Sequence, residues 1–249
     1  IPPGEFDMGS TEEDVAKLLE EAKAKNLPGY YIERLPSEAP KHRVRITKPF
    51  YLAASEVTQS QYERVMGNNP SKVKEDANCP VEMVDWDEAS AFCRKLGELS
   101  EERSAQREYR LAMEAEWEYA CRAGTKTKWS FGDDESALDE YAWYADNSGG
   151  MRHPVGEKKA NAWGLYDMHG GLSEWCQDHS HENYDGAPSD GGPWEEALGD
   201  MRVTRGGGFD ARAELCRSAY RGNDYQWSRE KDCGFRIAAG DPFSGLCTL

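Results

Sequence analysis

A glycine-rich stretch at residues 164–175, with the sequence GLYDMHGGLSEW, restricts the fold of this chain more than any other segment. Within it, Asp167 and Glu174 stand on either side of the pair Gly170 and Gly171. Two carboxylates that flank a glycine turn suit calcium, because glycine lets backbone carbonyls turn inward and complete a shell of about six to eight oxygen ligands. The other interpretation is a tight turn whose carboxylates are solvated. The spacing by itself leaves a calcium site and a simple turn equally open.

The composition indicates one globular domain over residues 1–249. Hydrophobic residues make up 38% of the chain, which is enough for a core, and the 24 glycines and 12 prolines indicate many turns. The net charge of -16 would repel a phosphate backbone, so we expect no nucleic-acid partner. No apolar run approaches the roughly 20 residues of a membrane helix, so we expect no membrane span. We also expect a monomer.

Hydrophobic spacing and capping residues predict an α+β chain. Strands are predicted within residues 1–10 and at 42–46, the latter sheet continuing at 50–52, and helices at about 12–25, after Thr58, at 86–99 and from Met113. Ser10 or Thr11 is expected to cap the first of these helices, Thr58 the second and Asp85 the third. The last helix carries three glutamates, Glu114, Glu116 and Glu118, which we interpret as structural or solvated rather than catalytic.

Regular periodicity fades from residue 129 onward, which predicts loops and short strands. The acidic, glycine-rich residues 178–200 are the predicted mobile surface loop, with solvated carboxylates. The pair His179 and His181 lies there, and a metal site is the minor alternative to a polar loop. The seven cysteines include no CxxC pair, which disfavours a zinc ribbon. Cys93 and Cys121 are expected to be buried within helices.

A series of short motifs follows one order along nearly the whole chain. They are PPGEFDMGS at 2–10, EVT at 56–58, VDW at 84–86, YRL at 109–111, EAEWEYA at 114–120, the 164–175 stretch, RGG at 205–207 and GFR at 234–236. This order resembles the formylglycine-generating enzyme (sulfatase-modifying factor) family. The resemblance implies that family's variant of the C-type lectin fold, an α+β domain with much irregular structure. It also implies calcium ligation by the side chains of Asp167 and Glu174 and the carbonyls of Gly170 and Leu172. A second calcium would use Asn147 and Ser148.

The enzymes of this family bind copper through two cysteines five residues apart and convert a substrate cysteine to formylglycine. Here Cys216 falls at the second position but Ala211 occupies the first, and alanine cannot ligate a metal. Three further positions depart from the family pattern, with Gly208, Gly171 and Ser173 standing where serine, asparagine and tryptophan are usual. We therefore interpret Cys216 as a buried thiol or a disulfide partner, with Cys121 as one candidate for the other half.

The leading hypothesis is a non-catalytic ligand-binding protein. Variable proteins of diversity-generating retroelements use the same scaffold type and mutate a C-terminal segment before a GFR-like end, and the layout here resembles theirs, with a scaffold at 1–202 and a binding segment at about 203–237. The residue types of that segment suit contact with a protein or surface ligand. The predicted contact residues are Phe209, Asp210, Arg212, Glu214, Tyr220, Asn223, Asp224, Tyr225, Gln226, Trp227 and Arg229. Mutated asparagine codons do not easily yield Glu214, Gln226, Trp227, Glu230 or Lys231, so these positions would be fixed.

Two other functions stay open at this point. One is a copper- or iron-dependent oxidase of the family acting on a protein cysteine, for which Cys216, His153 and His169 are the available metal donors. The other is an accessory module of a longer signalling chain. The sequence leaves the compartment open, and a segment upstream of residue 1 would be compatible with a cell-surface or virion-associated protein.

Overall fold

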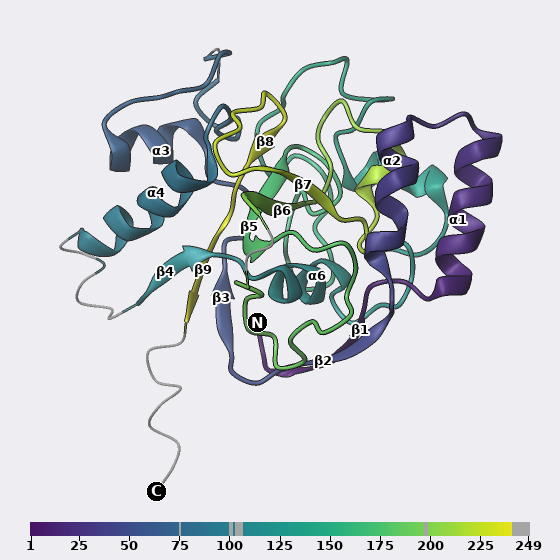
Figure 1. Cartoon of the computed structure of the whole chain (residues 1–249). Coiled ribbons are helices and arrows are strands. Elements are labelled where there is room, and N and C mark those ends of the chain that lie inside the picture. The colour runs from purple at the N-terminus through teal and green to yellow at the C-terminus, as the bar shows by residue number, and fades with distance from the viewer. Residues whose placement is uncertain (75, 100–101, 103–106, 197–198, 241–249) are drawn as a thin grey trace, which may run out of the picture.

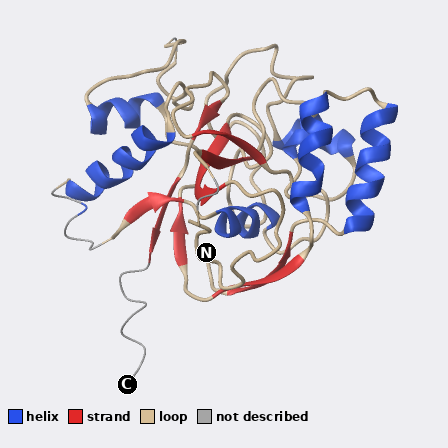
Figure 2. Ribbon diagram, in the orientation of Figure 1, coloured by secondary structure: helices blue, strands red, loops and turns tan. Residues whose placement is uncertain are grey.

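The computed structural model describes residues 1–74, 76–99, 102, 107–196 and 199–240. Within these residues, three small sheets and several short helices are joined by long irregular segments, so the predicted α+β class is confirmed (Figure 2). Helices α1 and α2 lie at one side and α3 and α4 at the other, with the sheets between them (Figure 1). No helix in the described part of the chain is long and apolar enough to cross a membrane.

The first sheet joins the two N-terminal strands predicted from the sequence. Strand β1 (Gly4–Met8) pairs antiparallel with β2 (His42–Ile46). Between them lie α1 (Glu12–Ala24), α2 (Gly29–Arg34) and the 3-10 helix η1 (Leu35–Glu38). The hydroxyl of Thr11 accepts the N–H of Asp14 at 3.0 Å, which satisfies one of the unpaired donors at the start of α1. The predicted cap is therefore confirmed.

Strand β3 (Phe50–Leu52) does not continue the sheet of β2, and that prediction is wrong. It pairs antiparallel with β9 (Ile237–Gly240), which also pairs with β4 (Tyr109–Leu111). Pro49 stands between the two segments and has no N–H to extend the β2 ladder. The N–H of Phe50 donates instead to the carbonyl of Ile1 at 3.1 Å, so the chain leaves one sheet and enters another within a few residues.

Two helices with predicted caps cover the sheet that contains β9. They are α3 (Gln59–Met66), capped by Thr58 and ended by Gly67, and α4 (Trp86–Glu98), capped by Asp85. The rings of Tyr62 and Phe92 stack with centroids 5.5 Å apart, and Phe235 meets Phe92 edge to face at 5.3 Å. This aromatic cluster fixes the segment just before β9 against the helices.

The third sheet carries the C-terminal half of the chain. Its order is β7 (Gly222–Tyr225), β6 (Met201–Arg205), β5 (Ser173–His179) and β8 (Cys233–Gly234), with β5 and β8 parallel. The remaining short elements are η2 (Glu135–Ala137), α7 (Leu138–Tyr141) and η3 (Ala213–Cys216). The turns that link them contain many glycines, in agreement with the predicted irregular second half.

Helix α6 (Glu114–Arg122) is buried along its whole length and supplies carboxylates to arginines of the third sheet and its loops. Glu118 pairs with Arg205, and Glu114 pairs with Arg221 at 2.6 Å. Two more buried pairs follow the same pattern outside this helix, Arg217 with Glu38 at 2.6 Å and Arg236 with Glu174 at 2.7 Å. The structural interpretation of Glu114, Glu116 and Glu118 is confirmed, since Glu116 pairs with Arg110.

The prediction that the acidic surface loop starts at residue 178 is wrong, because Asp178 belongs to β5 and is buried. Its Oδ2 accepts the N–H of Glu114 at 2.7 Å and its Oδ1 accepts the N–H of Trp194 at 2.8 Å. The ring of His181 stacks on Trp194 at 3.6 Å, and both of its nitrogens contact backbone carbonyls. This geometry gives His181 a packing role rather than the metal role considered above. Residues 197–198 of the predicted loop lie outside the described residues.

The described cysteines are all buried and none forms a disulfide, so the candidate bond between Cys121 and Cys216 does not exist in this structure. Burial of Cys93 in α4 and of Cys121 in α6 is confirmed.

Candidate functional site

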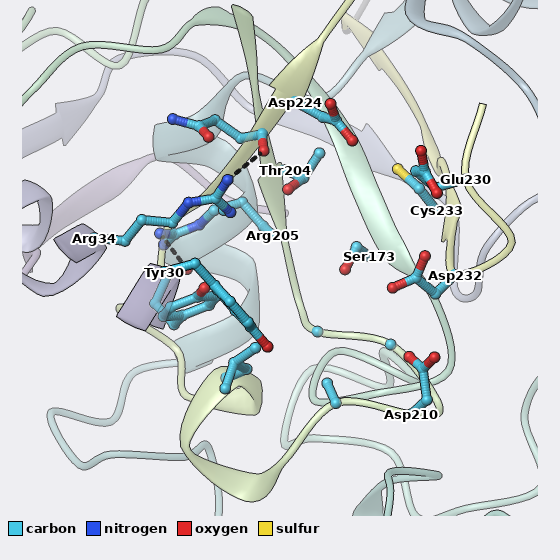
Figure 3. A pocket seen from close by; sticks show the side chains of 17 residues that line it. Tyr30, Arg34, Ser173, Thr204, Arg205, Asp210, Asp224, Glu230, Asp232 and Cys233 are labelled. Carbon is cyan, nitrogen blue, oxygen red and sulfur yellow. Dashed lines mark hydrogen bonds between the residues drawn. The ribbon is translucent and has the colours of Figure 1, made fainter. Parts of the chain in front are cut away.

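A cleft of about 560 Å³ lies where the predicted binding segment meets helix α2 (Figure 3). The backbone around it comes from the end of β6, the following glycines, β7 and the residues before β8. Its lining is Tyr30, Arg34, Ser173, Thr204, Arg205, Gly207, Gly208, Asp210, Ala211, Leu215, Tyr220, Gly222, Asn223, Asp224, Glu230, Asp232 and Cys233. Ligand pockets commonly have volumes of about 300–1,000 Å³, so this cleft is of a size that holds a small molecule or a side chain of a partner.

The two sides of the cleft carry opposite charges. In Figure 3, Arg34 and Tyr30 lie on one side, the carboxylates of Asp224, Glu230, Asp232 and Asp210 lie on the other, and Ser173 and Thr204 lie between them. Burial, and then the nearby charge of Asp210, raises the pKa of Asp232 above its usual range.

Four of the predicted contact residues line this cleft: Asp210, Tyr220, Asn223 and Asp224. Sequence reasoning missed Tyr30 and Arg34, because α2 reaches the cleft only through the tertiary fold. The side chain of Arg34 donates to the carbonyl of Asn223 at 3.0 Å across 189 residues of sequence, and no local pattern encodes that contact. It also missed Glu230 and Asp232, although both lie within the predicted segment and their charge was a usable signal.

The other predicted contact residues lie outside the cleft. Phe209 is buried beneath Arg152 and Lys231 and presents no surface, contrary to expectation. Glu214 pairs with Lys25, and Arg229 with Asp85 and Glu88. Arg212 is exposed, Gln226 is half-buried, and Tyr225 and Trp227 are exposed rings stacked 5.0 Å apart.

The segment around Cys216 is tightly packed. A side chain at Gly207, where φ is +76°, would lie 2.9 Å from the carbonyl of Leu215 and 3.0 Å from Sγ of Cys216, so only glycine fits. Burial raises the pKa of Cys216 far above its usual range and that of Cys121 to about 12. Both side chains are therefore neutral thiols at pH 7 and poor nucleophiles, because nucleophilic attack uses the thiolate.

Comparison with known proteins gives this site its context. The model of the Sulfatase-modifying factor enzyme 1-like domain matches residues 1–240. The chain belongs to this family. Among solved structures, Treponema denticola variable protein 1 is 29% identical and has a TM-score of 0.79, with 96% of this chain and 93% of that chain covered.

Two curated relatives have different names. A chaperone protein LppX of Paenibacillus barcinonensis is 32% identical over 65% of this chain and 75% of that protein. A formylglycine-generating enzyme of Mycobacterium tuberculosis is also 32% identical, over 70% of this chain and 62% of that protein. Proteins similar to this chain thus include one named as an enzyme and a solved structure named as a variable protein.

The other donors considered for a copper site in this family member are engaged in hydrogen bonds. Nδ1 of His169 lies 2.9 Å from the carbonyl of Cys216, and its Nε2 lies 2.9 Å from Oγ of Ser130. Burial lowers the pKa of His169 to about 4, so the ring is neutral at pH 7. Nε2 of His153 contacts the carbonyl of Ser148 at 2.9 Å. In this arrangement, neither His169 nor His153 provides the second soft ligand that Ala211 fails to supply.

Asp167 and Glu174, the expected side-chain ligands of calcium, belong to a group of buried carboxylates. Both oxygens of Glu174 bind Arg236 at 2.7 Å, and its Oε2 also accepts the indole N–H of Trp117 at 2.8 Å. Asp167, with φ of +58°, accepts the N–H of Gly156 at 2.7 Å. Glu174 is therefore committed to an ion pair in the arrangement described.

Glu56, which sequence reasoning missed, lies beside this group of carboxylates. It is buried, its Oε1 accepts the N–H of Leu172 at 3.2 Å, and its Oε2 has no hydrogen-bond partner among the described residues. Burial, and then the charges of Asp167 and Glu174, raises the pKa of Glu56 well above its usual range. Two neighbouring buried carboxyl groups, Glu56 and Asp167, fit a hard cation that takes the remaining ligands from backbone carbonyls.

Asn147 and Ser148, the residues considered for a second calcium, form hydrogen bonds within their own turn. Oδ1 of Asn147 accepts the N–H of Tyr144 at 2.9 Å, and Oγ of Ser148 accepts the N–H of Gly150 at 3.0 Å. Both side chains stabilise the turn at 144–150. Among the described residues, no group of three His, Cys, Asp or Glu side chains is arranged to hold a metal, so carbonyl ligands would be needed at either position.

Proposed function

We propose that the chain is a non-catalytic ligand-binding protein on a formylglycine-enzyme-like scaffold, and that its ligand binds in the cleft between α2 and residues 203–237. The observation that carries this proposal is the combination of an open polar cleft with a buried, neutral Cys216 and Ala211 at the position of the first cysteine. The cleft offers contact groups, while the segment that would carry the oxidase chemistry has a single thiol.

The solved Treponema variable protein supports a finer form of the proposal, in which this chain is a variable protein of a diversity-generating retroelement. Four of the predicted contact residues, all within the proposed variable segment, line the cleft, as a display function requires. The test is genetic. A nearby template repeat of the DNA for residues 203–237 and a reverse transcriptase gene are expected, and their absence from the genome would contradict this form.

The alternative is a copper-dependent oxidase, favoured by the relative named as a formylglycine-generating enzyme. We expect wild-type protein to bind no Cu(I) through Cys216 and to consume no oxygen with a cysteine-containing peptide. The measurement is anaerobic Cu(I) titration followed by oxygen uptake, with Cys216→Ser as the negative control. The Ala211→Cys variant is the matched control that returns a second thiol, and it is expected to bind Cu(I) more tightly than wild type. Turnover by wild type that is lost in Cys216→Ser would overturn the non-catalytic proposal.

We also propose one calcium, bound by Glu56 and Asp167 with carbonyls of Gly170 and Leu172. Saturating calcium at about 100 times Kd is expected to add about 2.7 kcal/mol to the free energy of unfolding of wild type. Glu56→Gln is expected to lose that gain and to unfold no more easily than wild type without calcium, because the substitution removes a buried carboxylate. Urea unfolding with calcium or with a chelator measures both. Glu63→Gln, at an exposed position of α3, is the control. Equal gains in the two variants would rule this ligand set out.

A further inference from the structure

The charges on the two sides of the cleft are not paired with each other. Arg34 contacts the carbonyl of Asn223 and the hydroxyl of Tyr220, and it forms no ion pair with any described carboxylate. A guanidinium has five donors, so most of the hydrogen-bonding capacity of Arg34 is left for another acceptor. One side of the cleft thus carries a positive charge without a protein counter-ion.

On the other side of the cleft, only one of the four carboxylates forms an ion pair within the described residues. Asp210 pairs with Lys231 at 2.8 Å. Asp224 accepts the hydroxyl of Ser228 at 2.7 Å, and Glu230 and Asp232 form no ion pair there. The charges of Asp210 and Glu230 both act on Asp232, and the neighbouring cation Lys231 is paired with Asp210. A ligand with a cationic group would relieve the remaining repulsion.

The floor of the cleft, between Arg34 and the carboxylates, is polar and includes a glycine in place of a larger side chain. A side chain at Gly208 would lie 3.0 Å from Cβ of Asp232 and 3.5 Å from Oδ1 of Asp210, so glycine at this position keeps the approach to both carboxylates open. Arg205 also lines the cleft, but its side chain is fully buried and is held by Glu118 and by the carbonyls of Ala219 and Tyr220. The charged groups that a ligand can reach are therefore those on the two sides of the cleft.

We propose that this cleft binds a small zwitterion of the amino-acid type, with its carboxylate on Arg34 and its ammonium group on Glu230 and Asp232. A ligand with one charge would leave the opposite side unpaired, whereas a zwitterion compensates both sides at once. The class includes free amino acids and short peptides with free ends. This inference rests on the proposed ligand-binding function and names the ligand class of that same site.

The test compares glycine with four forms of triglycine: unmodified, N-acetylated, C-amidated and blocked at both ends. Binding to the full chain is measured by isothermal titration calorimetry or by NMR. We expect the unmodified peptide to bind at least about tenfold more tightly than either singly blocked form, and the doubly blocked form not to bind. Tighter binding of triglycine than of glycine would identify short peptides as the source of the ligand, and the reverse order would identify free amino acids.

Variants assign each end of the ligand to one side of the cleft. Arg34→Met is expected to remove the preference for a free carboxylate but to keep the preference for a free amine. The double variant Glu230→Gln and Asp232→Asn is expected to do the opposite. Arg45→Met, an exposed arginine of β2, is the control that should change neither preference.

Several outcomes would overturn the inference. These are equal binding of free and blocked peptides, a uniform loss in both variants, and no binding of any probe. None of them depends on copper or oxygen, so the inference can fail while the non-catalytic proposal stands. Conversely, turnover in the oxygen-uptake assay would contradict the proposed function without altering the end preferences measured here.

Discussion

Replacing Arg236 by methionine is expected to lower the free energy of unfolding by about 3–5 kcal/mol, because it leaves buried carboxylates without their counter-ion. Arg236 is fully buried and makes two hydrogen bonds to Glu174, and it also donates to the carbonyls of Ala53 at 3.0 Å and Tyr166 at 2.9 Å. Glu56 and Asp167 lie in the same group, so several acidic side chains depend on this one cation. Urea unfolding followed by tryptophan fluorescence measures the loss.

Two further variants make this result specific. Adding Glu174→Gln to Arg236→Met is expected to recover part of the loss, since the double variant removes a buried charge that the single variant leaves unpaired. Arg43→Met breaks an exposed pair with Asp7 and Glu5 and is expected to change stability by no more than about 1 kcal/mol. If Arg236→Met unfolded at the same urea concentration as Arg43→Met, the buried pair would have no special role.

Asp178 is expected to make the protein less stable as the pH rises toward neutrality. Burial, and then the charge of Glu114, raises the pKa of Asp178 in the folded chain from 3.8 to about 7. An acid with a raised folded pKa holds a proton that the unfolded chain has already released, so folding is favoured at low pH and that contribution is lost between about pH 4 and pH 7. A shift of about three pKa units corresponds to about 4 kcal/mol as an upper bound.

Asp178→Asn isolates this effect, because the amide does not titrate. An amide has only one acceptor oxygen, while Asp178 accepts from two backbone N–H groups, so the variant should carry a constant loss of about 1–2 kcal/mol. Apart from this constant loss, the free energy of unfolding of the variant relative to that of wild type should rise between pH 4 and pH 8. Asp185→Asn, at an exposed position, serves as the matched control. A difference that stays constant with pH would disprove the titration of Asp178.

The local elements could be predicted because their signals are local. The caps Thr11, Thr58 and Asp85 lie within three residues of the N–H groups that they accept, and Gly67 ends α3 with a positive φ of 84°. Strand pairing could not be predicted in the same way. Phe50–Leu52 looks like a continuation of the preceding strand, and its true partner β9 begins nearly 190 residues later in the chain.

The residues of the candidate site likewise divide into those that a local pattern predicts and those that only the tertiary fold brings together. Asp210, Tyr220, Asn223 and Asp224 were found because they lie together in one polar segment. Phe209 was included with them on residue type alone, and its burial depends on Arg152, from a distant loop. Glu56 was missed because its proximity to Asp167 arises only when residues 56 and 167 meet in the folded chain.

The four buried arginine–glutamate pairs, at Arg205, Arg217, Arg221 and Arg236, are spaced along the binding segment from its beginning to its end. Each arginine points into the protein, while the side chains of Asp210, Asn223 and Asp224 face the cleft. In a ligand-binding protein of the kind proposed, folding and recognition are encoded at different positions of the same stretch of sequence. The proposal therefore predicts mutational tolerance at the cleft-facing residues, because these can be exchanged while the anchors keep the backbone in place.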